Sequence, residues 1–438
     1  MIRGALTMAR LLAAPKIIGY VGGTTWARDA LDLWRRYRRG EPVLDGPHIA
    51  EYEAALRAYF GGHQAVTFSA GRMALYAILR GMFGSQGGEV VTPGYTCIVT
   101  PNAIRYAGMT PVYVDVSPRD FNMTVENVQA AITPRTQTIV LQHTFGVPCN
   151  VDAFMDLSRR TGIPIIEDCA HAFGARWRGR LLGRFGHAAF YSTEGSKMFS
   201  TERGGVALTA DADLAVRLQA IQQESPFADE ALERYAVKRW CYRAAFCGNP
   251  WIYPRAQAVE SVLRWLGVSE VCNMVGYSDA MYQKEVAGER FSPYPSRLPN
   301  LMGYVGLIQL RRLDADVAHR QALAHRLEQA LPELGARVAK YPHNLAAPSW
   351  VRFPFIPPDR ERWRTCIARA GFVPGVWLDD PIHPKGSNWE AAGYRRGQCP
   401  VAEALARDIL NVPVHRRVAP HALEHLLQRL AAACGADV

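Results

Sequence analysis

The sequence lacks the long uninterrupted apolar runs that mark membrane-spanning helices. No stretch of 18 or more apolar residues occurs among its 438 residues, whereas a spanning helix needs about 20. The first twenty residues are basic and partly apolar, but Arg10, Pro15 and Lys16 interrupt them and no small-residue cleavage site follows. We therefore predict neither a membrane span nor a signal peptide.

Cysteine pairs and long basic blocks are also missing. The nine cysteines are scattered without a CxxC pair, which excludes the usual spacings of metal sites and disulfide frameworks. Scattered free thiols favour a reducing compartment, so we expect a cytoplasmic protein without a bound metal. The formal net charge is +10, but the densest basic run, at 35–41, is short. We therefore expect no nucleic-acid partner.

A regular alternation of helix and strand patterns is present between about 45 and 210. Apolar spacing near 3.6 residues predicts helices over 48–60 and 71–83. Short β-rich runs predict strands at 64–69, up to Pro93, and at 111–116, 138–145, 163–169, 188–193 and 205–210. Strands that alternate with helices need crossover connections, and fully apolar strands need cover on both faces. The pattern predicts an α/β fold with a mainly parallel sheet between helices.

The remainder of the chain reads differently. Residues 221–296 are dense in Trp, Tyr and Arg, and we interpret them as an insertion or excursion from the main domain. A long helical pattern begins at about 303, and a strand is predicted at 350–356, with helices at 359–371, 401–410 and 420–433. We predict four parts: an N-terminal segment (1–44), a large domain (45–220), the atypical segment (221–296), and a connecting helix with a smaller α+β domain (297–438).

Three groups with chemical potential follow predicted strands, where ligands bind in open α/β sheets. A Ser-Ala-Gly-Arg turn at 69–72 opens a helix, and the N–H groups at a helix N-terminus attract phosphate. Asp168 follows the apolar strand IPII, and Lys197 follows the strand AAFYS. Taken singly, each has an ordinary structural interpretation: a glycine turn, a solvent-facing carboxylate and a surface lysine.

The combination is more specific than its parts. A phosphate cradle, a carboxylate and a lysine 29 positions later (197 − 168) supply what pyridoxal 5′-phosphate (PLP) needs. The helix N-terminus and Ser192 would hold the phosphate. Asp168 would keep the pyridine nitrogen protonated, and Lys197 would carry the cofactor covalently as an imine and then move protons.

These motifs resemble the DegT/StrS family of sugar aminotransferases, which are fold-type-I enzymes that use PLP. The resemblance covers about 40–210 and again 297 to the end. Its specific stretches are IEDCAHAFGA (166–175) and FYSTEGSK (190–197), supported by SAGRMAL (69–75). The resemblance implies a mainly parallel, seven-stranded sheet between helices, and a homodimer whose active sites are shared between subunits.

Carried over position by position, the resemblance places Lys197 on the covalent lysine and Asp168 on the carboxylate at the pyridine nitrogen. His171 falls against the cofactor ring, while Gly71 and Ser192 fall at the phosphate.

Several positions depart from the family pattern. Arg72 replaces a phosphate-binding threonine and would offer a charge instead. Cys97 stands where an aromatic side chain stacks on the cofactor ring, and nearby Tyr95 is a candidate replacement.

Arg297 is predicted to bind substrate in the neighbouring subunit's site. His383, within DDPIHP, is also assigned to substrate binding.

The resemblance implies transfer of an amino group from an amino acid, with glutamate expected, to a keto sugar carried on a nucleotide. The setting would be glycan, lipopolysaccharide or secondary-metabolite biosynthesis. Alternatives with the same fold are a PLP enzyme for a non-sugar or lipid-linked ketone, and a sugar dehydratase. Dehydratase relatives replace the lysine with histidine or add an iron–sulfur centre, so Lys197 and the scattered cysteines disfavour them.

A third possibility is association with lipid. Residues 234–266 alternate basic with aromatic and aliphatic side chains, which suits a helix at a membrane surface. Packing of the same side chains against protein is the interpretation that we favour, so any membrane contact is expected to be weak.

Overall fold

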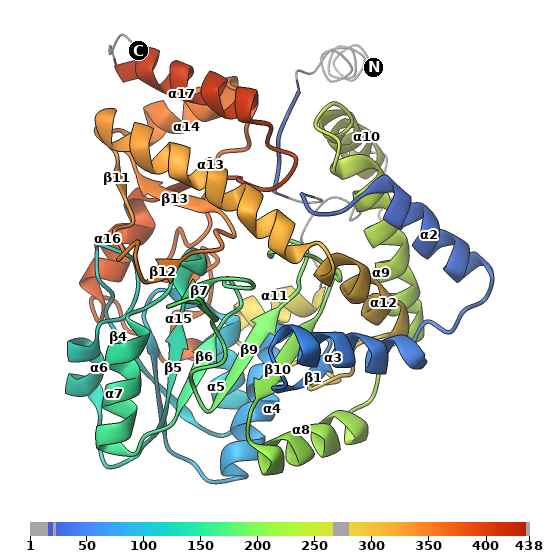
Figure 1. Ribbon diagram of the computed structural model, residues 1–438, viewed down its shortest axis with the longest axis vertical. Helices are drawn as coiled ribbons and strands as arrows, with labels where there is room; N and C mark the ends of the chain where they lie inside the picture. The colour runs from blue at the N-terminus through green and yellow to red at the C-terminus, as the bar shows by residue number, and fades with distance from the viewer. Residues whose placement is uncertain (1–15, 21–22, 266–279, 435–438) are drawn as a thin grey trace.

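The computed structural model describes residues 16–20, 23–265 and 280–434 (Figure 1). Its centre is a seven-stranded sheet of order β1-β10-β9-β6-β5-β2-β4. The strands are β1 Gln64–Phe68, β2 Glu89–Pro93, β4 Thr110–Val114, β5 Thr136–Gln142, β6 Ile165–Asp168, β9 Ala188–Ser192 and β10 Gly205–Thr209. Every pairing in this sheet is parallel except the two made by β10. The predicted mainly parallel α/β sheet is confirmed.

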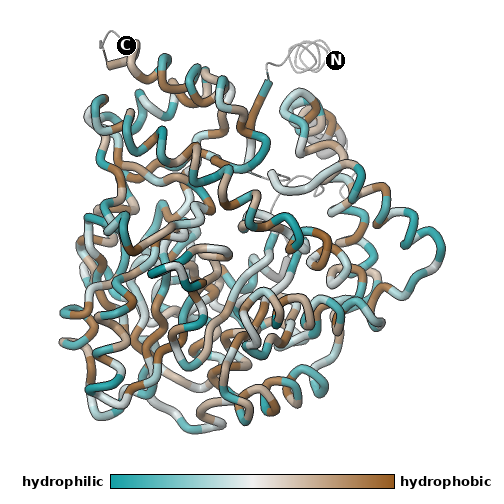
Figure 2. Tube along the Cα trace, in the orientation of Figure 1, coloured by the Kyte–Doolittle hydropathy of each residue, from teal (hydrophilic) through white to brown (hydrophobic). Residues whose placement is uncertain are grey.

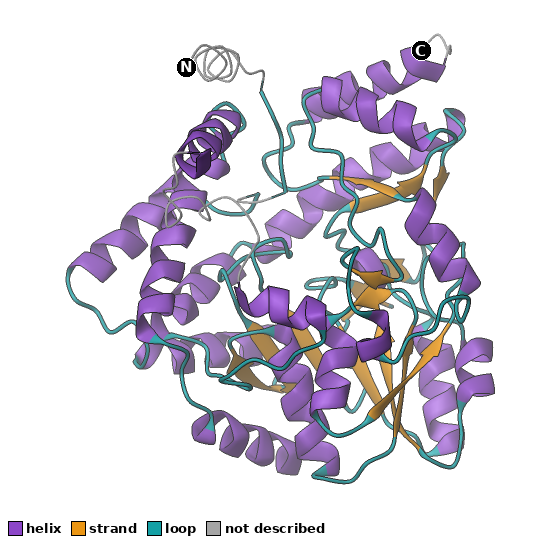
Figure 3. Cartoon of the chain, turned by 180° about the vertical axis from the view of Figure 1, so that it is seen from behind, coloured by secondary structure: helices purple, strands orange, loops and turns teal. Residues whose placement is uncertain are grey.

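The central strands contain consecutive apolar residues because helices cover both faces of the sheet (Figure 3). In β5, Ile139 and Leu141 belong to the core cluster that includes α3 (Pro47–Tyr59), whereas Val140 between them belongs to the cluster with α4 (Gly71–Phe83). Successive strand side chains point to opposite faces, so each strand contributes to two cores. Hydropathy alternates along the peripheral helices (Figure 2). The other helices of this layer system are α5 Val99–Tyr106, α6 Val125–Ala131, α7 Val151–Thr161 and α8 Ala212–Glu224.

The 221–296 segment forms helices that pack beside the large domain. They are α9 Glu230–Tyr242, the π-helical turn η2 Arg243–Cys247, α10 Tyr253–Trp265 and α11 Ala280–Ala287. The N-terminal helix α2 (Ala27–Arg38) lies against α9 and η2 (Figure 1). Trp240 on α9 is buried, whereas Trp251 is 58% exposed. Much of the segment predicted to contact lipid therefore packs onto protein, and its contact with a membrane stays a prediction.

The C-terminal part forms a smaller α+β unit above the large sheet (Figure 1). Its three-stranded sheet has the order β11-β13-β15. The elements are α12 Asn300–Leu310, α13 Leu313–Glu333, β11 Arg337–Val338, β13 Phe353–Ile356, α14 Arg360–Arg369, α15 Trp389–Ala392, α16 Pro400–Asp408, β15 Leu410–Val412 and α17 Pro420–Cys434. Small strands join this unit to the large domain: β14 Ile382–His383 pairs with β3 Thr96–Cys97, and β12 Ala346–Ala347 pairs with β7 Arg176–Trp177, which pairs with β8 Arg180–Leu181.

Two predicted C-terminal elements differ from the observed ones. The long helix expected from about 303 is two helices, α12 and α13, which meet where Arg312 forms an ion pair with Asp29 of α2 at 2.7 Å. The strand expected at 350–356 begins only at Phe353, because Trp350 has a left-handed backbone (φ +55°) that a strand cannot contain. Among the described helices, none has both the length and the apolarity to cross a bilayer. The four-part division of the chain stays a prediction.

Candidate functional site

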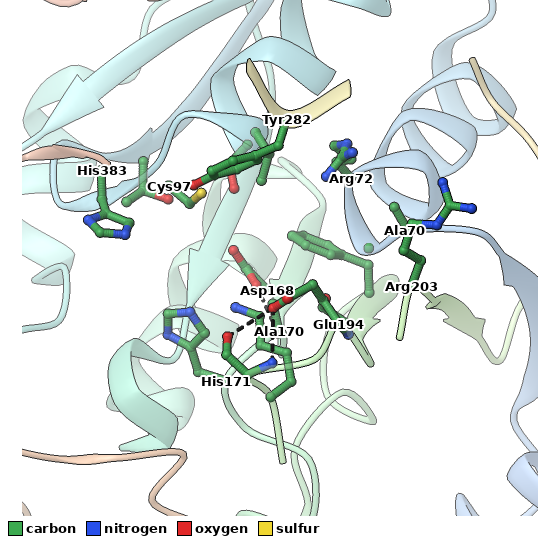
Figure 4. A pocket seen from close by; sticks show the side chains of 18 of the residues that line it. Ala70, Arg72, Cys97, Asp168, Ala170, His171, Glu194, Arg203, Tyr282 and His383 are labelled. Atoms are coloured by element: carbon green, nitrogen blue, oxygen red, sulfur yellow. Dashed lines mark hydrogen bonds between the residues drawn. The ribbon is translucent and has the colours of Figure 1, made fainter. Parts of the chain in front are cut away.

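A cavity of about 390 Å³ lies at the carboxyl ends of β5, β6 and β9 (Figure 4). Eight of the ten predicted site residues line it: Gly71, Arg72, Cys97, Asp168, His171, Ser192, Lys197 and His383. The structure thus brings together side chains from both halves of the chain. Sequence analysis missed further lining residues, which include Gln142, Glu194, Arg203, Arg239, Tyr282, Arg352 and Trp377.

Lys197 lies in the loop that connects β9 to β10, which we call the lysine loop (residues 193–204). Its Nζ atom is 4.3 Å from the centroid of the Trp377 ring. Burial lowers the pKa of the amine, while the negative charges of Glu194 and Asp168 act in the opposite direction. A lowered pKa leaves more of the amine neutral, and the neutral amine is the form that attacks a carbonyl.

Asp168 occupies the last position of β6, at the edge of the sheet where the cavity opens. One carboxylate oxygen, Oδ1, accepts a hydrogen bond from the backbone N–H of Ala170 at 2.9 Å. Burial nevertheless raises the pKa of this carboxyl group to about 6. A buried carboxylate without a full set of partners favours a cation beside it, and a protonated ring nitrogen would serve.

Gly71 begins helix α4 directly after strand β1. A Cβ atom at this position would lie 2.9 Å from Cβ of Ser192 and 3.1 Å from the carbonyl oxygen of Tyr191. The start of the helix and the end of β9 therefore approach too closely for any larger residue. Since the first turn of a helix leaves N–H groups without intrahelical partners, this junction suits a phosphate group.

Arg72 lines the cavity but is already engaged within the chain. Its Nε atom forms an ion pair with the buried carboxylate of Glu285 on α11 at 2.8 Å, and its guanidinium lies 5.3 Å from the centroid of the Phe291 ring. The charge of Glu285 offsets the charge that Arg72 was expected to offer a phosphate. That role for Arg72 stays a prediction.

The two histidines of the cavity are held in defined orientations. Nδ1 of His171 accepts a hydrogen bond from the backbone N–H of Phe145 at 3.2 Å, and its ring centroid is 4.4 Å from that of Trp377. Nδ1 of His383 lies 3.1 Å from Asp379. Burial lowers the pKa of both imidazoles, which favours their neutral forms. Neutral His171 therefore keeps an Nε2–H donor.

Two predicted site residues do not line the cavity. Tyr95 is fully buried in the core, with a hydroxyl that has no hydrogen-bond partner, so it does not replace the aromatic residue expected at position 97. The structure corrects that prediction, because the Tyr95 side chain lies in the core and only Cys97 of the two lines the cavity. Arg297 instead pairs with Asp45 at 3.4 Å and lies over the Phe227 ring.

A cluster of potential metal ligands beneath the cavity has a structural role. Donor atoms of His143, Glu167 and Cys169 lie within 4.8 Å of one another. The Glu167 carboxylate accepts hydrogen bonds from the backbone N–H groups of Gly183, Phe185 and Gly186, and lies 3.3 Å from Nε2 of His143. These bonds occupy both carboxylate oxygens, so Glu167 orders the loop at 183–186 that precedes β9.

One of the missed lining residues, Gln142, could have been predicted from the sequence. Gln142 ends β5 at the same sheet edge as Asp168, and its Nε2 donates to the backbone oxygen of Tyr95 at 2.9 Å. The strand-end rule used for Asp168 would have found it. Arg352 and Trp377 come from the C-terminal unit, where no local pattern marks them as cavity residues.

Comparison with known proteins identifies the family. The sequence profile of the DegT/DnrJ/EryC1/StrS aminotransferase family matches residues 27–244 and 262–431. The chain belongs to this family. It is therefore an aminotransferase, and the family implies PLP as the cofactor. The profile omits only 245–261 of the 221–296 segment.

Named relatives agree with this assignment. GDP-perosamine synthase of Caulobacter vibrioides is 29% identical over 374 residues, which span 84% of this chain and 85% of the relative. L-glutamine:scyllo-inosose aminotransferase of Streptomyces griseus is 36% identical over 174 residues, 40% of this chain and 41% of that protein. The crystal structure of S. venezuelae DesV has a TM-score of 0.70 and 25% identity, and the match covers 94% of this chain and 95% of DesV.

Proposed function

We propose that this aminotransferase moves an amino group from an amino acid, with glutamate as the expected donor, to a keto sugar carried on a nucleotide, using PLP attached to Lys197. The observation that carries the proposal is the convergence of Lys197, Asp168 and the Gly71 turn in one buried cavity. The relative with the longer match is named for a GDP-linked sugar, which supports a nucleotide sugar as the acceptor.

The residues present fit this cofactor. The close approach of Gly71 to Ser192 forms a cradle for the phosphate, and Asp168 would pair with the pyridine nitrogen. When bound, PLP withdraws electrons from the substrate carbon that loses its proton. Lys197 Nζ would accept that proton and return it, a task that suits an amine with a lowered pKa.

Reductive trapping tests the covalent site. Borohydride treatment of the protein loaded with PLP, followed by peptide mass mapping, should place the cofactor mass on the peptide that contains Lys197. Lys197→Ala should remove this label, whereas Lys340→Ala, at an exposed lysine remote from the cavity, should keep it. Label retained in Lys197→Ala would contradict the proposal.

A screen of donors and acceptors tests the reaction itself. Addition of glutamate should change the cofactor's absorbance, and a nucleotide-linked keto sugar should reverse the change. Absence of any change with every amino donor would eliminate amino transfer by this site. Reversal by a non-sugar or lipid-linked ketone alone would favour the alternative acceptor class.

The proposal also includes a cytoplasmic homodimer. Arg297 lies outside the cavity of its own chain, near the exposed carboxylate of Asp45, which agrees with a role toward a neighbouring subunit. The cytoplasmic location follows from the cysteine pattern alone.

A further inference from the structure

Helix α11 brings one aromatic side chain, Tyr282, from the 221–296 segment to the cavity. Its ring lies on the Cys97 side, across the cavity from Asp168 and Ala170 (Figure 4). We propose that the Tyr282 ring stacks on the pyridine ring of the bound cofactor and forms one wall of its binding site. This inference rests on the proposed function, because it requires a bound cofactor.

The phenol of Tyr282 lies beside the end of the short strand β3 (Thr96–Cys97). Its hydroxyl group lies beside the Cys97 thiol, as Figure 4 shows. Burial raises the pKa of Tyr282, so the ring stays a neutral phenol. The small thiol at position 97 leaves room that the tyrosine ring occupies. The two residues together form one continuous wall.

Helix α11 is itself fixed to the elements that build the site. Glu285 lies one helical turn after the tyrosine and is fully buried. It pairs with Arg72 of α4 at 2.8 Å and accepts a hydrogen bond from Asn102 Nδ2 at 2.8 Å. The carbonyl oxygen of Val286 accepts a bond from the backbone N–H of Asn388 at 2.9 Å. The ring is therefore pre-organised relative to the phosphate cradle.

The other large aromatic rings of the cavity have different roles. Phe190 is 3% exposed and belongs to the core cluster on one face of the sheet. Trp377 contacts the His171 ring at 4.4 Å and the Arg352 guanidinium at 4.3 Å. Tyr282 is only partly buried and faces the cavity, so its ring surface is available to a planar ligand. Offset stacking of two aromatic rings is favourable beyond the area that it buries.

Binding of pyridoxamine 5′-phosphate tests the proposal, because this form cannot form an imine with Lys197 and reports non-covalent contacts alone. Its Kd would be measured on the cofactor-free protein by quenching of tryptophan fluorescence. Tyr282→Phe keeps the ring and should stay within about two-fold of wild type. Tyr282→Ala and Tyr282→Leu should raise the Kd by roughly ten-fold or more. Gln283→Ala, an exposed neighbour on the same helix, should change nothing.

Two results would overturn the inference. One is a Kd for Tyr282→Ala and Tyr282→Leu close to that of wild type. The other is an equal loss in Tyr282→Phe, which would assign the effect to the hydroxyl contact with Cys97. Circular dichroism and thermal unfolding verify that each variant is folded, and the leucine variant preserves apolar volume. If wild type itself fails to bind, the proposed function fails; if wild type and all variants bind equally, only this inference fails.

Discussion

Asp168 is a cavity-lining residue whose buried charge opposes folding. Its side chain is buried with a single backbone donor, and its pKa is raised to about 6. The folded state therefore binds a proton more tightly than the unfolded state between about pH 4 and 6. In the cofactor-free protein, stability falls as the pH rises through this range, and the full penalty is present above it.

Replacement of Asp168 by asparagine should separate stability from function. At pH 7, cofactor-free Asp168→Asn is expected to be about 2 kcal/mol more stable than wild type, with little difference near pH 4. The same variant should bind PLP more weakly, because the proposed partner of the pyridine nitrogen is lost. Urea denaturation at the two pH values measures the first effect. Equal stability of both proteins at pH 7 would contradict this account of Asp168.

Gly71 provides a second test at the residue scale. In Gly71→Ala, the new Cβ atom would lie 2.9 Å from Cβ of Ser192, so the helix start or the end of β9 must shift. We expect a loss of about 1–3 kcal/mol in stability and a larger Kd for inorganic phosphate or PLP. Gly84→Ala probes backbone preference alone, because no atom lies within 4 Å of its Cβ position. If Gly71→Ala binds phosphate with unchanged affinity, the junction of α4 and β9 does not form the phosphate site.

At the scale of elements, helix α9 fixes the lysine loop. Trp240 Nε1 donates to the carbonyl oxygen of Ser200 at 2.7 Å. Glu202, also in the loop, is buried and pairs with Arg239 at 2.6 Å and Arg243 at 2.5 Å. Glu202 has φ +63°, a conformation that costs a non-glycine residue about 1 kcal/mol. The ion pairs offset that cost, and the loop that carries the lysine is thereby ordered.

Removal of the Glu202 charge should therefore be costly. In Glu202→Gln, two buried guanidinium groups lose their shared carboxylate, and we expect a loss of about 3 kcal/mol or more in unfolding free energy. The control is Arg364→Gln, which breaks an exposed pair with Glu361 and should leave the thermal transition nearly unchanged. If Glu202→Gln and the control unfold at the same temperature, the ion pairs of Glu202 do not stabilise the loop.

Sequence patterns predicted the helices and strands whose burial follows a regular pattern along the chain. The strands at 138–145 and 188–193 were found because a sheet covered on both faces favours consecutive apolar residues, such as Ile139–Leu141. Asp168 and Lys197 were predicted to share a site because strand ends meet at one edge, and both line the cavity. Tyr282 and Trp377 could not be found, because their place in the cavity depends on how distant segments pack and not on local periodicity.

At the scale of the whole molecule, the predicted sharing of sites between subunits can be tested by complementation. Lys197→Ala and Arg297→Ala homodimers should each be nearly inactive if Arg297 serves the neighbouring site. After mixing and exchange of subunits, half of the dimers are hybrids, each with one complete site. Activity should then return to about one quarter of wild type. Full subunit exchange without any recovered activity would place Arg297 outside the partner's site.

The pairing of β14 with β3 joins His383 to Cys97, and Trp377 closes the same cavity beside Lys197. Protein synthesis proceeds from the N-terminus, so the lysine leaves the ribosome long before these two side chains. A nascent chain would hold the reactive amine in an unfinished pocket that is open to solvent. If Lys197 binds the vitamin-derived group as proposed, its acquisition would follow completion of nearly the entire polypeptide.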